Sequence, residues 1–232
     1  MLNPDLLEQL RAFDTPTICN ALEVIDNKFR RGDFNTRPLV APFPDLPPMV
    51  GYARTATIRS IHPSELNSAD ARAQRIGYYE YVASPPGPQI VVIQDLDGPD
   101  VGFGAFWGEV QSTVHKALGC AGVVTDGSIR DIPQWAPGLN VLAGSIMPSH
   151  GYVHLADYGK EVRVAGMMVR SNDLIHADRH GAVVIPHDVA EKLPAACDFM
   201  ARKEAVILDM ARKPGFNAAM LREALAKQDE IH

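Results

Sequence analysis

The chain has 232 residues, with 28 acidic residues against 22 Lys and Arg, so its formal net charge is −6 at pH 7. Apolar residues make up 46% and charged residues 22%, which are ordinary values for a globular protein. This acidic balance, without a run of Lys or Arg, argues against a nucleic-acid-binding protein, which needs a basic face.

Residues 1–13 contain no apolar segment behind a basic start, so we expect no signal peptide. The longest stretch without Asp, Glu, Lys or Arg, residues 132–156, is interrupted by three prolines and is therefore not a membrane span. Cys19, Cys120 and Cys197 lie far apart and form no CxxC motif. These features predict a cytoplasmic protein whose cysteines are reduced, buried fillers.

The N-terminal third predicts two helical segments around a strand. We expect residues 4–29 to be helical, with Thr15 as an N-cap and Pro16 in the first helical position. Five prolines between residues 36 and 48 predict an irregular connector. The alternating, Thr- and Ile-rich residues 51–61 predict a strand, and residues 64–79 a polar helix.

The middle of the chain predicts alternating strands and helices. A buried strand at 89–95 leads into a glycine-rich loop through Gly108, and residues 109–118 predict a helix that Gly119 terminates. Strands at 121–125 and 140–146 follow. Later predicted elements are short strands at 161–164, around 169, at 173–176 and at 182–185, a hairpin turn at 178–181, and a helix over 188–213 that Pro194 breaks or kinks.

This order predicts an α/β fold whose central sheet has a parallel βαβ core flanked by helices. We expect residues 1–187 to form the core domain and residues 188–232 a C-terminal helical extension that serves as a subunit interface. No internal repeat interrupts this division.

The predicted βαβ unit places two loops at one edge of the sheet. Both parallel strands end there, so the loop before Glu109 faces residues 126–131, which include Arg130 and Asp131. The helix start from Gly108 to Gln111 offers free N–H groups, and Arg130 a planar fork of donors, which together suit a carboxylate or phosphate. Two carboxylates with water suit Mg²⁺ or Mn²⁺. The alternative is that Arg130 and Asp131 are solvated and that Glu109 complements the helix dipole.

Other motifs favour structural roles. The glycines at 102, 104 and 108 do not have GxGxxG spacing, so a nucleotide or S-adenosylmethionine site is the weaker reading. We expect His150 and His154 to be a solvated or hydrogen-bonded pair rather than a metal site. Trp107 is expected to pack in the core rather than to line a substrate cleft. Three tyrosines, at 78, 79 and 81, fit core packing and an interface patch equally well.

Residues 104–131 carry a resemblance to a known family. They read GAFWGEVQSTVHKALGCAGVVTDGSIRD, in which an acid is followed after twenty residues by Arg-Asp. This pattern is similar to the class II pyruvate aldolases that cleave 4-hydroxy-4-methyl-2-oxoglutarate and 4-carboxy-4-hydroxy-2-oxoadipate, whose RraA-like, swivelling ββα-like fold is shared with the regulator of ribonuclease activity A. The resemblance extends to residues 15–22, 51–58 and 169–186, and so covers most of the chain.

The resemblance implies a role for each matched residue. Asp131 would ligate Mg²⁺ or Mn²⁺, Arg130 would bind the keto-acid end and stabilise the enolate oxygen, and Glu109 would hold metal-bound water and help position a base. Glu204, from the C-terminal helix of a neighbouring subunit, would complete the site in a homotrimer or hexamer. The backbone N–H groups that would hold the pyruvyl carboxylate belong to Gly108, Glu109, Val110 and Gln111.

The sequence departs from the family pattern at two positions. Glu109 replaces the usual aspartate, and Asn20, with Glu23 nearby, stands where the aldolases usually carry an acid. The implied activity is metal-dependent cleavage of a 4-hydroxy-2-keto acid to pyruvate and a second keto acid, with oxaloacetate decarboxylation as a side activity and no Schiff-base lysine. The competing function is a non-catalytic, protein-binding regulator of ribonuclease activity, which does not need this set of charged residues.

Overall fold

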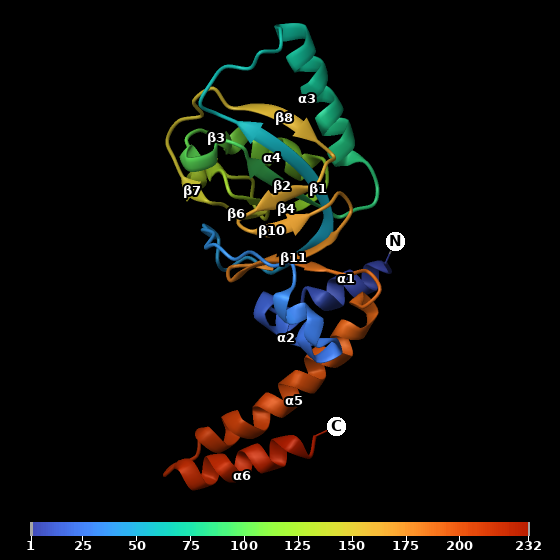
Figure 1. The fold of residues 1–232 in the computed structure, drawn as a ribbon, viewed down its shortest axis with the longest axis vertical. Helices are drawn as coiled ribbons and strands as arrows, with labels where there is room; N and C mark the ends of the chain where they lie inside the picture. The colour runs from blue at the N-terminus through green and yellow to red at the C-terminus, as the bar shows by residue number, and fades with distance from the viewer. Residues whose placement is uncertain (1, 232) are drawn as a thin grey trace.

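A mixed seven-stranded sheet forms the centre of the computed structural model, which describes residues 2–231 (Figure 1). The strand order is β12-β11-β1-β2-β4-β6, and β8 pairs with the second half of β1. Strands β1, β2, β4 and β6 are parallel, whereas β11, β12 and β8 are antiparallel to their neighbours. The strands of this sheet are β1 (Met49–Arg59), β2 (Gln89–Asp95), β4 (Cys120–Thr125), β6 (Asn140–Leu142), β8 (His154–Tyr158), β11 (Leu174–Asp178) and β12 (Gly181–Ile185).

The predicted parallel βαβ unit is confirmed. Strand β2 leads to α4 (Glu109–Ala117) and then to β4, with Val91 opposite Val123 in a parallel register. Along β2, alternate side chains enter two different cores: Val91 packs with α3 (Ser68–Ala83) and Val92 with the hairpin of β9 (Val162–Val164) and β10 (Met167–Val169). Both faces of the strand are covered, which explains its unbroken apolar pattern.

A second, small sheet lies at the carboxyl edge of the parallel strands. It consists of β3 (Ala105–Trp107), β5 (Ser128–Ile129) and β7 (Ser145–Ile146). The sequence predicted loops where β3 and β5 lie, and one strand over 140–146 where the chain forms β6 and then β7. The prediction was wrong there because Gly144 crosses between the sheets, donating its N–H to the Gly127 carbonyl at 2.9 Å.

The N-terminal segment forms two helices, α1 (Pro4–Leu10) and α2 (Thr15–Ile25), followed by the 3-10 turn η1 (Asn27–Arg31). The predicted N-cap was one residue off. Asp14 caps α2 by accepting from the Thr17 N–H at 2.9 Å. Thr15 has different partners: its N–H donates to Asp178 at 3.0 Å, and its hydroxyl lies 3.0 Å from Nδ1 of His176.

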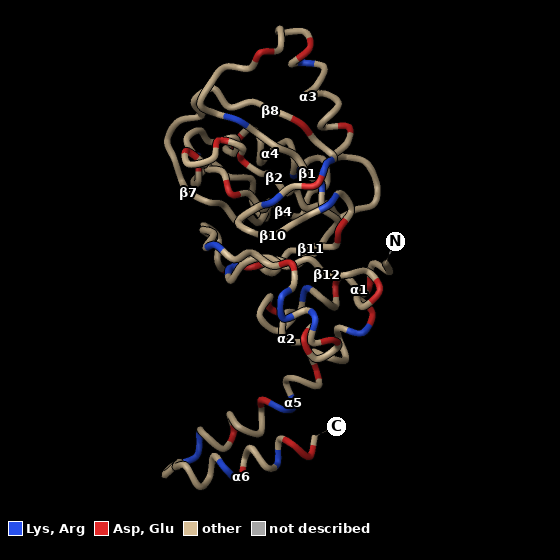
Figure 2. Tube along the Cα trace, viewed as in Figure 1, with Lys and Arg blue, Asp and Glu red and all other residues tan. Residues whose placement is uncertain are grey.

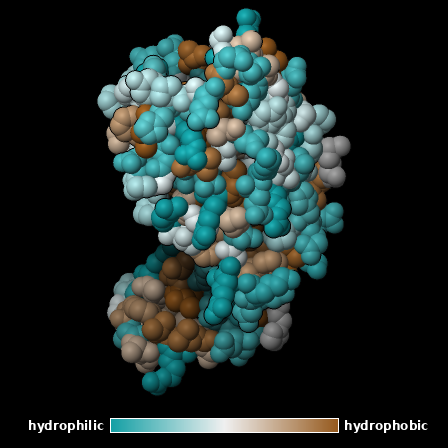
Figure 3. Space-filling view, turned by 45° about the horizontal axis from the view of Figure 1, so that its top comes forward, coloured by the Kyte–Doolittle hydropathy of each residue, from teal (hydrophilic) through white to brown (hydrophobic). Residues whose placement is uncertain are grey.

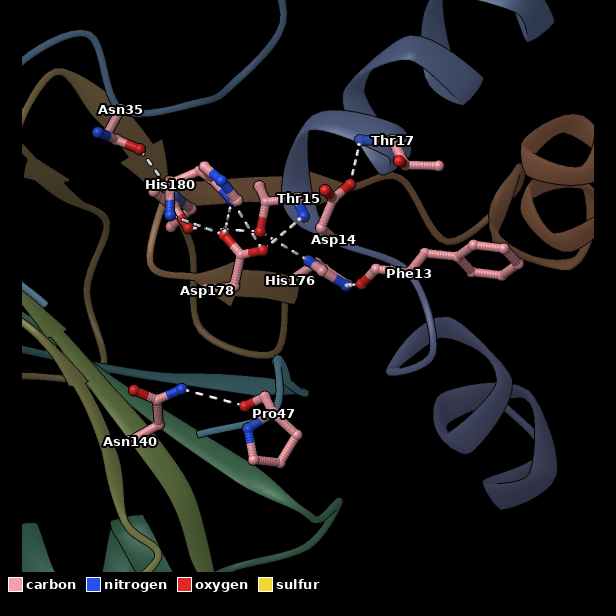
Figure 4. A network of polar contacts seen from close by, with 12 residues as sticks. Phe13, Asp14, Thr15, Thr17, Asn35, Pro47, Asn140, His176, Asp178 and His180 are labelled. Atoms are coloured by element: carbon pink, nitrogen blue, oxygen red, sulfur yellow. Dashed lines mark hydrogen bonds and ion pairs between the residues drawn. The ribbon is translucent and has the colours of Figure 1, made fainter. Parts of the chain in front are cut away.

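Buried hydrogen bonds fasten these helices to the sheet (Figure 4). Nε2 of His176 lies 3.1–3.2 Å from the carbonyls of Phe13 and Leu10, so it carries the hydrogen, and Nδ1 accepts from Thr15. Burial lowers the pKa of His176, which keeps the ring neutral. The 178–181 turn, predicted as a hairpin, closes this cluster, with Asp178 paired to Gly181.

The C-terminal region forms a helical arm. After the 3-10 turn η4 (Ala190–Lys192), α5 (Leu193–Ala211) and α6 (Ala218–Asp229) make a hairpin that projects away from the sheet (Figure 1). Pro194 lies in the first turn of α5 and begins the helix rather than breaking it. The first turns of α5 pack with α1 and α2; the division into residues 1–187 and 188–232 stays a prediction.

Charged residues are spread along the chain, whereas two of the cysteines and several large aromatic side chains are buried. Acidic and basic residues are interspersed along the chain (Figure 2). Over residues 2–231, no helix has the length and apolarity needed to cross a membrane. The three cysteines are free, with Cys120 and Cys197 buried, and Trp107 and Tyr78 are fully buried in the core.

Candidate functional site

The ends of β3 and β5 bring Gly108 and Glu109 against Arg130 and Asp131. The Arg130 N–H donates to the Trp107 carbonyl at 2.9 Å, which fixes the two strand ends side by side. Oδ2 of Asp131 accepts from the Glu109 N–H at 3.2 Å and lies 3.5 Å from Nε of Arg130. Glu109 and the Arg130-Asp131 pair, which twenty intervening residues separate, therefore meet at the carboxyl edge of the sheet, as the βαβ geometry predicted.

Asp131 adopts a backbone conformation that is uncommon for a residue other than glycine. Its φ of 54° and ψ of 41° lie in the left-handed region, which costs an L-residue about 1–2 kcal/mol. The Glu109 N–H and a hydrogen bond from the Gln134 N–H to the Asp131 carbonyl hold it there. Strain of this kind persists where surrounding structure enforces it, and it is concentrated at functional sites.

Gly108 is needed because of its small size. A Cβ at this position would lie 2.5 Å from Oδ2 of Asp131 and 3.2 Å from Cγ of Arg130. Its φ of −165° is ordinary extended backbone, so the requirement is the close approach of the Asp131 carboxylate to the start of α4. The sequence alone did not predict this steric reason for Gly108.

The start of α4 offers unoccupied hydrogen-bond donors. Within residues 2–231, no acceptor receives the backbone N–H of Val110 or Gln111, and these groups carry the positive end of the helix dipole. The Arg130 side chain is 35% exposed and makes no hydrogen bond through its terminal nitrogens to the described residues. Unbonded backbone N–H groups and the two terminal guanidinium nitrogens of Arg130 at one edge are suited to bind a carboxylate.

The same edge provides one carboxylate suited to a divalent cation. The Asp131 side chain is 38% exposed and uses Oδ2 internally, which leaves Oδ1 without a partner among the described residues. No group of three or more His, Cys, Asp or Glu side chains that could hold a metal occurs in residues 2–231. One partly exposed carboxylate could hold only a cation that keeps most of its water, as Mg²⁺ does, so Asp131 is the residue here that could serve as a ligand.

An aromatic cluster supports the start of α4 from behind. The Tyr79 hydroxyl donates to Oε1 of Gln111 at 2.9 Å, and Nδ1–H of His115 donates to the Gln111 carbonyl at 2.7 Å. The Tyr78 hydroxyl in turn donates to Nε2 of His115 at 2.8 Å. Burial lowers the pKa of His115 to about 4, so the ring is neutral. These residues position the loop; the sequence identified the tyrosines but not their partners.

Three buried aspartates hold the loop between β2 and β3. Oδ1 of Asp126 accepts from the Asp95 N–H at 2.8 Å, and Asp95 accepts from the N–H groups of Asp97 and Gly102. Asp97 accepts from the Ser60 hydroxyl at 2.8 Å. Burial raises the pKa of Asp95 and Asp126. The Asp126 carboxylate thus accepts from backbone N–H groups and has a structural role.

The remaining predicted residues lie elsewhere. Glu204 is on α5, in the arm that projects away from the sheet (Figure 1), so one chain does not bring it to Asp131. Asn20 and Glu23 are on α2, where Glu23 pairs with Arg30 at 3.2 Å. His150 and His154 each bond a nearby carbonyl through Nδ1, as expected for a hydrogen-bonded pair.

Three kinds of comparison relate this chain to known proteins. A family model described as RraA-like, Aldolase/RraA, matches residues 15–184. A protein of Halalkalibacterium halodurans named "Putative 4-hydroxy-4-methyl-2-oxoglutarate aldolase" is 28% identical over 192 residues, covering 82% of this chain and 80% of its own. An uncharacterised protein from Pseudomonas syringae superposes with a TM-score of 0.71 at 19% identity, covering 97% of this chain and 95% of its own. RraAS2 of Streptomyces coelicolor, described as an unusual member of the RNase ES inhibitor RraA family, gives 0.68 at 22% identity, covering 88% and 95%.

Proposed function

The chain belongs to the RraA-like family, Aldolase/RraA, and from that premise we propose that it is a divalent-metal-dependent lyase. Its substrate is a 4-hydroxy-2-keto acid of the 4-hydroxy-4-methyl-2-oxoglutarate kind, which it cleaves to pyruvate and a second keto acid. Oxaloacetate decarboxylation, which passes through the same pyruvate enolate, is the expected side activity.

One observation carries the proposal: the start of α4 and the Arg130-Asp131 pair form one polar edge. Free backbone N–H groups, the terminal nitrogens of the Arg130 guanidinium and a partly exposed carboxylate lie together there. Asp131 is fixed in place by the Glu109 N–H at 3.2 Å and by Nε of Arg130 at 3.5 Å. A 2-keto acid presents a carboxylate and an adjacent carbonyl oxygen, which match these donors. The name of the Halalkalibacterium relative supports the same substrate class.

The reaction assigns a role to each of these groups. The N–H groups of Val110 and Gln111 bind the C1 carboxylate, and Arg130 donates to the C2 oxygen. When the C4 hydroxyl loses its proton, the C3–C4 bond breaks, C4 becomes the carbonyl of the leaving keto acid, and the electron pair moves toward the C2 oxygen. Arg130 binds that oxygen more strongly as its charge grows, which is the condition for lowering the barrier. A proton returned to C3 completes pyruvate.

A divalent cation held by Asp131, with Glu109 beside it, would supply Lewis-acid stabilisation of the same developing charge. Glu109 is exposed at the first position of α4, where it can orient water. With the roles assigned in this way, the reaction needs no lysine nucleophile.

Exposed apolar side chains support an assembled form of the enzyme. Around the candidate edge, Phe103, Val110 and Ile146 are between 51% and 71% exposed. On the arm, Leu208 and Leu225 are 45% and 43% exposed, and apolar surface gathers on the part of the molecule that contains α5 and α6 (Figure 3). Apolar patches of this kind mark interaction sites. We propose that the arm of one subunit covers the candidate edge of its neighbour and brings Glu204 to it in a trimer or hexamer.

The competing proposal is a regulator that binds a ribonuclease. The Streptomyces coelicolor neighbour carries that description, but at 22% identity its likeness supports the fold alone. A regulator does not require an aspartate in the left-handed backbone conformation packed against a glycine. The conformation of Asp131 next to Gly108 therefore favours the lyase.

The deciding experiment measures pyruvate release from 4-hydroxy-4-methyl-2-oxoglutarate and from oxaloacetate, with Mg²⁺ and after EDTA. The proposal expects release from both substrates that EDTA abolishes and added Mg²⁺ restores. Absence of release from both, with the protein folded by circular dichroism, would favour the regulator.

A further inference from the structure

A cavity of about 240 Å³ lies beside the candidate edge, between α3 and the β8 side of the sheet. Phe106 and Gln111, which flank the Trp107–Val110 segment, both line it. The cavity and the proposed pyruvyl site therefore share a wall: the backbone N–H of Gln111 belongs to the helix start, and its side chain borders the cavity.

The charges lining this cavity are all of one sign. Arg72 and Arg75, one turn apart on α3, both line it, and no Asp or Glu does. Neither arginine forms an ion pair with any residue between 2 and 231. Asp70, on the same turn of the helix, accepts instead from Nδ2 of Asn67 at 2.7 Å. Two uncompensated guanidinium groups at one cavity attract an anion.

Three neutral polar side chains of the cavity, Gln74, Gln111 and His154, already have partners. Nε2 of Gln74 donates to the Ala156 carbonyl at 3.0 Å, and Oε1 of Gln111 accepts from Tyr79 at 2.9 Å. Nδ1–H of His154 donates to the Tyr152 carbonyl at 2.9 Å. These bonds hold the lining in place, whereas the guanidinium groups of Arg72 and Arg75 make no side-chain hydrogen bond to the described residues. A planar fork of free donors is the usual partner of a carboxylate.

We infer that this cavity is the subsite for the second carboxylate of the substrate, and that Arg72 and Arg75 make the enzyme selective for dicarboxylic 4-hydroxy-2-keto acids. The inference rests on the proposed function. The first carboxylate and the keto group occupy the edge at Arg130, and the remainder of the molecule extends past Gln111 toward α3.

A matched pair of uncleavable ligands tests the subsite by binding alone. 2-Oxoglutarate and 2-oxopentanoate differ only in that the distal carboxylate of the first is a methyl group in the second. Calorimetric titration of the full chain with Mg²⁺, in buffer without phosphate or sulfate, should show tighter binding of 2-oxoglutarate by at least about tenfold, because a charge-assisted hydrogen bond is among the stronger polar contacts. Equal affinities would overturn the inference.

Substitution of the arginines locates the preference. The double variant Arg72→Gln/Arg75→Gln should bring the affinity for 2-oxoglutarate down to that for 2-oxopentanoate and leave the latter within about twofold. Arg163→Gln, which removes an exposed arginine from β9 outside the cavity, is the control and should keep the preference. Both altered helix residues are exposed, so the fold should survive, and thermal melting checks this. A double variant that keeps the full preference would refute the subsite.

Exchange of the pyruvate methyl protons with deuterated water separates this inference from the proposed function. The exchange requires enolate formation at the Arg130 edge but no distal carboxylate, so the double variant should match the wild-type rate while its kcat/KM for 4-hydroxy-4-methyl-2-oxoglutarate falls at least tenfold. If the wild-type protein catalyses no exchange and no cleavage yet prefers 2-oxoglutarate through Arg72 and Arg75, the lyase proposal fails and the anion subsite stands. Equal loss of exchange and cleavage in the double variant would assign the arginines to the general integrity of the site.

Discussion

Replacing Gly108 with alanine tests whether the close approach of Asp131 to α4 matters for activity. The added Cβ would lie 2.5 Å from Oδ2 of Asp131, whereas ordinary contacts begin near 3.4 Å. The carboxylate must therefore move by about 0.9 Å, and it must weaken or lose the 3.2 Å hydrogen bond from the Glu109 N–H. Because the clash is with a partly exposed side chain and φ at Gly108 is extended, the fold can absorb the change.

A displacement near 1 Å at a reacting group can reduce a rate by about 10²-fold. We therefore expect Gly108→Ala to lower kcat/KM for pyruvate formation by roughly that factor, with a melting temperature close to that of the wild-type protein. The matched control is Thr113→Ala, an exposed change on the same helix, which should keep wild-type activity. Coupled pyruvate detection and circular dichroism make both measurements.

The reasoning fails if Gly108→Ala retains more than about a third of the wild-type kcat/KM. Such a result would mean that Asp131 can move without consequence, so its carboxylate would not be where the chemistry occurs. A large loss of melting temperature would point instead to a structural need for Gly108.

Three further predictions concern the same site and its support. Arg130→Ala should lower kcat/KM by about 10²–10³-fold with the fold intact, and Arg130→Lys should recover only part of it because the bidentate fork is lost; near-normal activity of the folded alanine variant would contradict this. Exhaustive chelation should abolish pyruvate release and added Mg²⁺ or Mn²⁺ should restore it, whereas inactivation by borohydride in the presence of substrate would indicate a Schiff base. His115 has a pKa of about 4 in the folded protein and near 6.5 in the unfolded chain, so its contribution to stability is complete above pH 6.5 and is lost as the pH falls toward 4. Protonation of His115 should therefore account for about 2 kcal/mol of the stability lost between pH 7 and pH 5. Urea titrations of the wild-type protein and His115→Gln at both pH values check this, and parallel losses in the two proteins would refute it.

The sequence predicted the parallel core because its signals are local. The strand at 89–95 and Gly119, which terminates α4 with a φ of +92°, lie where they were expected. Because parallel strands end at the same edge of a sheet, the sequence predicted that Glu109, Arg130 and Asp131 would lie close together. Strands β5 and β7, two residues each, carry too few side chains to show a period, so the sequence did not reveal them.

The parts of the site that the sequence missed depend on long-range contacts. The Gln111 side chain accepts a hydrogen bond from the Tyr79 hydroxyl, 32 residues earlier in the chain. The sequence around neither residue indicates this contact. The cap at Asp14 was misplaced because Asp14 and Thr15 are both capping residues, and only the buried bonds from Thr15 to His176 and Asp178 show why Thr15 is engaged elsewhere. The sequence placed Arg72 and Arg75 only in a polar helix, and the structure shows that both line one cavity.

The position of Glu204 on the projecting arm leads to a prediction about shared sites. If Glu204 acts on the edge of a neighbouring subunit, Arg130→Ala and Glu204→Gln should each be inactive alone, because every site then lacks one group. In mixed oligomers, an Arg130→Ala chain still supplies Glu204 and a Glu204→Gln chain still supplies Arg130, so some interfaces hold an intact site. Random mixing of equal amounts in closed rings gives about one quarter intact sites over all rings, because each interface joins two different surfaces. Double purification removes the unmixed rings, and every mixed trimer then holds one intact site out of its three, or about one third. Co-expression with two affinity tags, followed by assay of doubly purified protein, measures the recovery. Mixed oligomers that stay inactive, or an active monomer by light scattering, would confine the site to one chain and leave the arm without a catalytic role.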